Sequence, residues 1–131
     1  MVVEFFDMEV HEHPVIEGTV GEINALVVHR DYRGIEHWIA KHNAYSSWEA
    51  NRYRALQAGG ESAWGMLNPR QQKKYKSLPK WWLAPAYFCL SYFAKRGFLD
   101  GRVGFHFAML KAWYFYTIRL KIKHGGEWLS R

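Results

Sequence analysis

The clearest pattern along the chain is a stretch in which large apolar residues recur at helical intervals. It runs from residue 34 to about residue 58, lacks proline and internal glycine, and stops before Gly59 and Gly60. Apolar positions separated by three, four and seven residues lie on one face of a helix, and glycine is common just past a helix end. The spacing therefore predicts one long helix, with these apolar positions: Ile35, Trp38, Ile39, Tyr45 and Trp48.

Two almost continuous apolar runs follow, at residues 81–94 and 103–118, the second interrupted by His106 and Lys111. Each predicts a helix that is apolar nearly all round, and the turn at residues 98–101 makes the pair a helical hairpin. Neither run reaches the roughly 20 residues needed to cross about 30 Å of hydrocarbon. A membrane-spanning helix is therefore disfavoured.

Tryptophan and tyrosine concentrate in both runs, and lysine or arginine stands at their ends. This composition is typical of helices that lie in a membrane interface, although helices in a protein core are also apolar all round. Arginines beside the turn could bind a lipid phosphate, or only cap helices and extend to water. The predicted membrane-binding residues are Trp81, Trp82, Arg96, Arg102 and Trp113.

The rest of the chain gives weaker signals. Residues 17–29 combine β-branched residues with Gly18 and Gly21, which predicts two short strands joined by a turn. Residues 61–78 carry a basic cluster that predicts either a short basic helix or a solvated loop. We expect a mainly α chain with a short β element, divided into residues 1–60, a basic connector at 61–78 and a hairpin at 79–131.

Composition narrows the choice of partners. The chain has 131 residues, 49% of them apolar and 18% aromatic, with a net charge of +6. This pairing excludes a disordered tail and favours anionic partners, which could be phospholipid, nucleotide phosphate or nucleic acid. The start of the chain does not resemble a secretory signal. Cys89 is the only cysteine, so no disulfide forms within the chain, and its apolar neighbours predict a buried thiol.

Two segments could carry chemistry. The first contains Glu9, His11 and Glu12. Carboxylate and imidazole at this density could supply a general base or bind a divalent cation, and the alternative is a solvent-exposed polar edge.

The second segment lies in the predicted long helix, where His42, Ser46 and Glu49 follow one another at intervals of four and three residues. They form one polar stripe. The stripe could be a hydrogen-bonded network at the wall of a cleft, or a solvated face opposite a core contact made by the aromatic residues.

Five motifs stand in a particular order along the chain, at residues 10–12, 18–21, 29, 41–50 and 97–104. They read Val-His-Glu, Gly-Thr-Val-Gly, His, Lys-His-Asn-Ala-Tyr-Ser-Ser-Trp-Glu-Ala and Gly-Phe-Leu-Asp-Gly-Arg-Val-Gly. In this order they resemble the C-terminal region of bacterial family 2 glycosyltransferases that build lipopolysaccharide core and other surface polysaccharides.

The resemblance implies the end of a GT-A-type α/β enzyme that transfers a sugar with inversion from a nucleotide sugar to a lipid-linked or cell-surface glycan. It implies Glu12 as the base, His11 orienting it and Glu9 as the alternate base. Lys41, His42, Tyr45 and Glu49 would line the acceptor side.

The complete enzyme would use a divalent metal, Mg²⁺ or Mn²⁺, held by an Asp-x-Asp motif in a nucleotide-binding half. No Asp-x-Asp occurs in these residues, so this chain alone is expected to bind no metal and to be catalytically incompetent. The resemblance places the enzyme on the cytoplasmic face of the bacterial inner membrane as a peripheral or monotopic protein.

Two rival functions remain. A non-catalytic accessory protein that binds a membrane surface would need only the hairpin. A nucleic-acid-binding module is disfavoured, because the aromatic residues lie in continuous apolar runs rather than alternating with cations on one face.

Overall fold

The computed structural model describes residues 3–6, 13–16, 18–19, 21–22, 24–25 and 33–125. The chain divides into two compact units, Met1–Trp38 and Ile39–Arg131. The first contains β1 (Val3–Phe6) and β2 (His13–Ile16), an antiparallel pair in which Val3 lies opposite Ile16 and Phe6 opposite His13. The strand prediction was wrong for the described residues between 18 and 25, which lie outside any strand, and its last residues, 26–29, lie outside the described residues.

The long predicted helix is confirmed as α1 (Gly34–Gly65), which continues past the predicted glycine stop. Gly60 interrupts the helix with a φ of 62°, a left-handed conformation that glycine adopts without steric cost. The first helical segment therefore stops at the predicted glycines, and a second, short segment continues from the kink to Gly65. The buried face of α1 also differs from the predicted apolar one: Ile35 and Ile39 are exposed, whereas Ser46, Glu49, Ala50 and Leu56 are buried.

The basic segment forms a helix, α2 (Pro69–Ser77). Asn68 caps it, because its side-chain oxygen accepts a hydrogen bond from the Gln71 backbone N–H while the Gln71 side chain accepts one from the Asn68 N–H. Proline at the first helical position costs no hydrogen bond. Capping explains why a segment this rich in like charge is helical.

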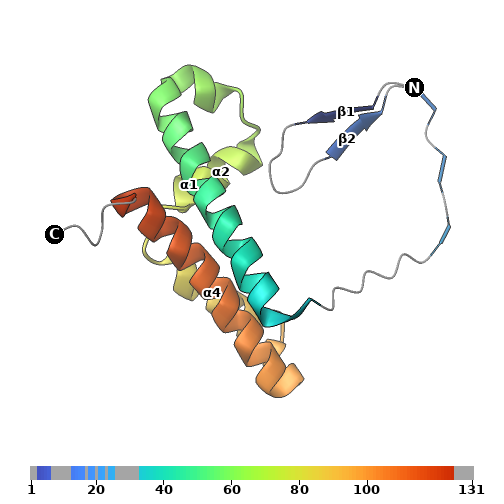
Figure 1. The fold of residues 1–131 in the computed structure, drawn as a ribbon, viewed down its shortest axis with the longest axis vertical. Coiled ribbons are helices and arrows are strands. Elements are labelled where there is room, and N and C mark those ends of the chain that lie inside the picture. The colour runs from blue at the N-terminus through green and yellow to red at the C-terminus, as the bar shows by residue number, and fades with distance from the viewer. Residues whose placement is uncertain are drawn as a thin grey trace. The chain divides into compact units, whose positions relative to one another are not determined.

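The two apolar runs form the hairpin, and Figure 1 shows its second arm, α4, beside α1. The first run is α3 (Leu83–Cys89) followed by the π-helical turn η1 (Leu90–Ala94), and the second is α4 (Gly101–His124), which begins after the short 3₁₀ helix η2 (Gly97–Asp100). The rings of Tyr87 and Phe115 stack with centroids 3.8 Å apart and fasten α3 to α4. The prediction of a mainly α fold is thus confirmed.

The hydrophobic core of the second unit lies where α1, α2, the start of α3 and the C-terminal half of α4 meet. Its buried members are Leu56, Leu67, Tyr75, Leu78, Leu83 and Ile118. None of them comes from η1, η2 or the first turns of α4. The distal end of the hairpin is therefore built outside this core, although its residues are strongly apolar.

Candidate functional site

Lys121 of α4 joins α1 to α4 through its ammonium group. Its Nζ donates to the backbone oxygen of Asn43 at 2.9 Å, to Asn43 Oδ1 at 2.7 Å, and to the hydroxyls of Ser46 and Ser47, each at 2.8 Å. Burial lowers the pKa of Lys121, because a less hydrated ammonium gives up its proton more easily. We call this contact, with Glu49, Lys74 and Tyr114 beside it, the polar seam.

Glu49 is the most buried charged residue of the polar seam. Glu49 is only 3% exposed, and its Oε1 accepts a hydrogen bond at 2.5 Å from Nζ of Lys74 on α2. The second carboxylate oxygen, Oε2, is buried without a hydrogen-bond partner in the part of the chain that the structure describes. A buried carboxylate depends on its cation, so this pair fixes α2 against α1.

Tyr114 of α4 lies beside His42 and Tyr45, two residues predicted to line the acceptor side. Its ring meets that of His42 edge to face at 5.4 Å, and His42 meets Tyr45 in the same way at 5.8 Å. The pKa of the Tyr114 hydroxyl is raised, first by burial and then by the negative charge of Glu49 and by Tyr45. Tyr114 therefore keeps its proton at any physiological pH.

The structure brings together the four residues predicted for the acceptor side. His42 and Tyr45 surround Tyr114, Glu49 lies close enough to act on it, and the Lys41 ammonium stands 5.6 Å above the Tyr45 ring. Of the two interpretations of the polar stripe, the solvated face is wrong, because Ser46 and Glu49 are buried and hydrogen-bonded to lysines of other helices. The cleft beside the stripe stays a prediction. The network fastens helices together, and acceptor binding by these four residues stays a prediction.

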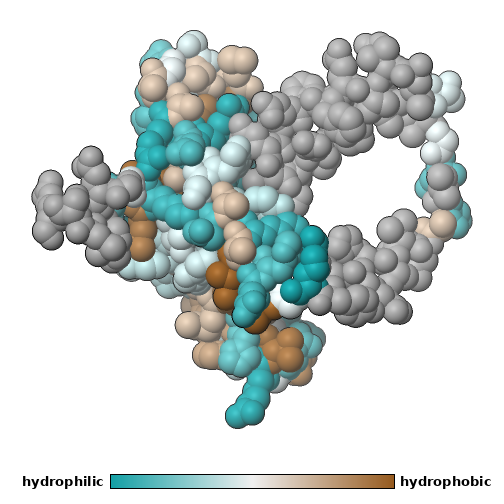
Figure 2. Space-filling view, in the orientation of Figure 1, coloured by the Kyte–Doolittle hydropathy of each residue, from teal (hydrophilic) through white to brown (hydrophobic). Residues whose placement is uncertain are grey.

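The hairpin exposes much of its apolar surface. Trp81 is 72% exposed, Trp82 is exposed too, and Trp113 is half-buried. Further exposed apolar residues crowd the distal end: Leu90, Phe93, Phe98, Leu99, Val103, Phe105 and Phe107. Figure 2 shows hydrophobic residues reaching the surface beside hydrophilic ones in the lower part of the view, where α4 begins. We use the name apolar tip for the seven exposed residues at the distal end of the hairpin: Leu90, Phe93, Phe98, Leu99, Val103, Phe105 and Phe107.

Cations surround the apolar tip. Lys95, Arg96 and Arg102 are exposed there, and Asp100 is the only acidic residue between positions 79 and 125, against eight lysines and arginines. The thiol of Cys89 is exposed on the same hairpin, so the prediction of a buried cysteine was wrong. The π-helical turn after Cys89 is one structural feature that the apolar run did not indicate.

Two of the motif glycines allow the turn of the hairpin to close. A Cβ at Gly104 would lie 1.8 Å from the backbone oxygen of Gly97, and one at Gly97 would lie 2.6 Å from the backbone oxygen of Ser91. Arg96 adopts a left-handed φ of 56°, which is uncommon for a residue with a side chain. The glycine spacing of this motif therefore reflects close backbone contact, which is a structural requirement.

The predicted catalytic residues Glu9, His11 and Glu12 lie outside the described residues. Among the residues that are described, no group of three His, Cys, Asp or Glu side chains is placed to hold a metal ion. Likewise, no helix in the described ranges is long and apolar enough to cross a membrane.

Sequence reasoning missed Lys74, Tyr114 and Lys121 as members of the polar seam. All three stand on helices other than α1, and Lys121 is 75 residues from Ser46 along the chain. Each is an ordinary residue of a basic or aromatic helix in the sequence. Only their meeting with α1 gives them a role, so no local signal could have identified them.

Comparison of this chain with protein-family models, with curated proteins and with solved structures gives no match.

Proposed function

We propose that this chain is the C-terminal portion of an inverting glycosyltransferase, whose helical hairpin holds the enzyme at an anionic membrane surface where it meets a lipid-linked acceptor. Membrane binding is supported by the exposed apolar tip and the cations beside it. The glycosyltransferase part is supported by the order of the five motifs. We further propose that the enzyme lies on the cytoplasmic face of the bacterial inner membrane, as a peripheral or monotopic protein.

The exposure of the apolar tip supports membrane binding because it costs free energy in water. Val103 is 74% exposed and Leu99 is 68% exposed, and burying apolar area gains about 25 cal/mol per Å². Contiguous exposed apolar residues mark surfaces that bind a partner. Lysine and arginine beside them contribute about 1 kcal/mol each near an anionic lipid surface.

In the proposed transfer, a carboxylate removes the proton of the acceptor hydroxyl as its oxygen bonds to the anomeric carbon. The bond between that carbon and the nucleotide diphosphate breaks in the same step, and the nucleotide diphosphate leaves. Glu12 is the proposed base, with His11 orienting it and Glu9 as the alternate. The divalent metal and the nucleotide sugar would belong to a nucleotide-binding half with its own Asp-x-Asp motif.

Membrane binding is tested by co-sedimentation with vesicles of phosphatidylglycerol and phosphatidylcholine. Leu99→Asp puts a charge into the apolar tip and is expected to abolish sedimentation. Met66→Asp is the matched control, because Met66 is 88% exposed but follows α1, away from the hairpin. Equal sedimentation of the two variants would remove the apolar tip as the binding surface.

The glycosyltransferase assignment is tested by reading the source DNA upstream of Met1. An open frame that encodes an Asp-x-Asp half supports it, and Glu12→Gln in that longer protein is then expected to lose donor turnover. Near-normal turnover would remove Glu12 as the base.

The second candidate function is a non-catalytic accessory protein at the membrane surface. One observation favours it: the apolar tip and its cations lie in the hairpin, apart in sequence from Glu9, His11 and Glu12. A stop codon just upstream of Met1 would select this function over the first.

A further inference from the structure

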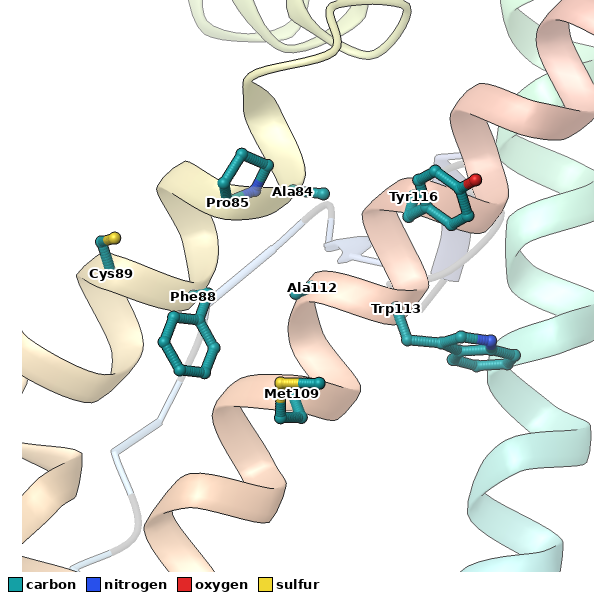
Figure 3. Close-up of a pocket in the computed structure, with 8 residues that line it drawn as sticks. All are labelled: Ala84, Pro85, Phe88, Cys89, Met109, Ala112, Trp113 and Tyr116. Carbon is teal, nitrogen blue, oxygen red and sulfur yellow. The ribbon is translucent and has the colours of Figure 1, made fainter.

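A groove runs between α3 and α4, with a volume of about 430 Å³. Figure 3 shows Phe88 and Met109 on facing turns of the two helices. Apart from the thiol of Cys89 and the polar ends of Trp113 and Tyr116, every side chain along the groove is hydrocarbon or thioether. The lining residues are Ala84, Pro85, Phe88, Cys89, Met109, Ala112, Trp113 and Tyr116. We call this the hairpin groove.

A second hollow, of about 520 Å³, lies at the start of α4 and has a different character. Arg102 and His106 line it together with Tyr92, Gly101 and Phe105, so it offers nitrogen donors and a positive charge. We call it the tip pocket. Arg102 can bind a phosphate with two parallel hydrogen bonds.

The two hollows adjoin each other. Phe105 lines the tip pocket and meets Phe88, which lines the hairpin groove, with ring centroids 6.0 Å apart. On α4, positions 102, 106, 109, 113 and 116 follow at intervals of three and four, so they form one stripe. The stripe begins with a cation and continues as an apolar surface.

The length of this stripe matches that of a lipid chain. His106 and Tyr116 are ten positions apart on α4, which at 1.5 Å per residue is about 15 Å. Half of a hydrocarbon core of about 30 Å is also about 15 Å, the depth that one lipid chain covers.

We propose that the tip pocket and the hairpin groove together bind one phosphate-bearing lipid, with the phosphate at Arg102 and His106 and one hydrocarbon chain along the groove. This inference rests on the proposed membrane role and names the ligand of that surface. Charge complementarity favours an anionic lipid, because the hairpin is positively charged and Asp100 is its only acidic residue between positions 79 and 125. An apolar peptide would fill the groove but leave Arg102 without a counter-charge.

Cys89 provides a site-specific readout, because it is the only cysteine, it is exposed, and it lines the hairpin groove. The experiment measures the rate at which iodoacetamide alkylates Cys89 in the full chain. Dioctanoyl phosphatidylglycerol, kept below its critical micelle concentration, is expected to slow alkylation in a saturable way. Glycerol phosphate, which has an anionic phosphate but no chain, is expected to leave the rate unchanged.

Arg102→Gln is expected to weaken the protection by the lipid about tenfold or more, as for loss of a charged hydrogen bond. Lys111→Gln is the matched control, because it removes the same charge from α4 at a residue that lines neither hollow. Equal protection of the two variants would overturn the phosphate assignment. Protection by glycerol phosphate alone would overturn the chain assignment.

Two further outcomes would overturn the inference. Alkylation unaffected by the lipid would show that the groove does not bind it, and alkylation that slows with protein concentration alone would show that a second copy covers the groove. Vesicle co-sedimentation separates these failures from failure of the proposed membrane role. A chain that sediments with vesicles but leaves Cys89 unprotected keeps the membrane role and loses the lipid site.

Discussion

Replacing Gly104 by alanine tests how closely the start of α4 approaches the turn of the hairpin at Gly97. The new Cβ would lie 1.8 Å from the backbone oxygen and 2.7 Å from the backbone carbon of Gly97. Ordinary contact begins at 3.4 Å, so the backbone would have to separate by about 1.6 Å. Because both contacts are to backbone, no side-chain rotation can relieve them.

The expected cost follows from two opposing effects. Overpacking costs about 1–3 kcal/mol, and a contact this short against backbone belongs at the upper end of that range or above it. Alanine is favoured over glycine inside a helix by about 1 kcal/mol, which offsets part of the loss. We expect the free energy of unfolding to fall by about 2 kcal/mol.

The assay is urea denaturation followed by far-ultraviolet circular dichroism. Gly65→Ala is the matched control, because it makes the same exchange at the end of α1 where no atom lies within 4 Å of the new Cβ. The control is expected to be no less stable than the parent. A Gly104→Ala protein as stable as the control would show that Gly97 and Gly104 do not meet as described.

Three further predictions concern the polar seam. Lys74→Ala should lower the free energy of unfolding by about 1–2 kcal/mol, less than for a fully buried pair because the lysine side chain is 45% exposed. Adding Glu49→Gln should restore most of this loss, as measured by urea denaturation. If the double variant shows no recovery, the ion pair is contradicted. Lys121→Met should cost about 1.5 kcal/mol and speed amide hydrogen exchange around Ser46, whereas unchanged exchange would contradict its tie to α1. Tyr114 keeps its proton in the folded state, whereas an unfolded tyrosine loses it near pH 10. The free energy of unfolding should therefore fall as pH rises above about 10, and it should fall less in Tyr114→Phe. Parallel pH profiles of the two proteins would contradict the raised pKa of Tyr114.

The helices were predictable because their signals are local. The apolar runs and glycines that predicted α1, α3 and α4 lie within the segments where these helices form. The strands were placed wrongly, since β-branched residues with glycine are compatible with several irregular conformations. A strand is also stabilised by its partner, which local sequence does not reveal.

The face that α1 buries was not predictable from the pattern. Ile35 and Ile39 carry the apolar period, yet they are exposed, and Ser46 and Glu49 are buried instead. Polar groups become tolerable inside when partners satisfy them, and here the partners, Lys121 and Lys74, come from distant helices. Periodicity indicates that a helix has two faces and does not reveal which one another helix will cover.

The sequence by itself determined that this chain is mainly helical and that it carries a basic aromatic hairpin, because propensity and charge act between near neighbours. The tertiary structure decided what each helix covers. It buried Glu49 against Lys74, left Cys89 and the apolar tip exposed, and joined a cationic pocket to an apolar groove along α4. These features depend on contacts between residues far apart in the chain, whose energies exist only once the helices have packed.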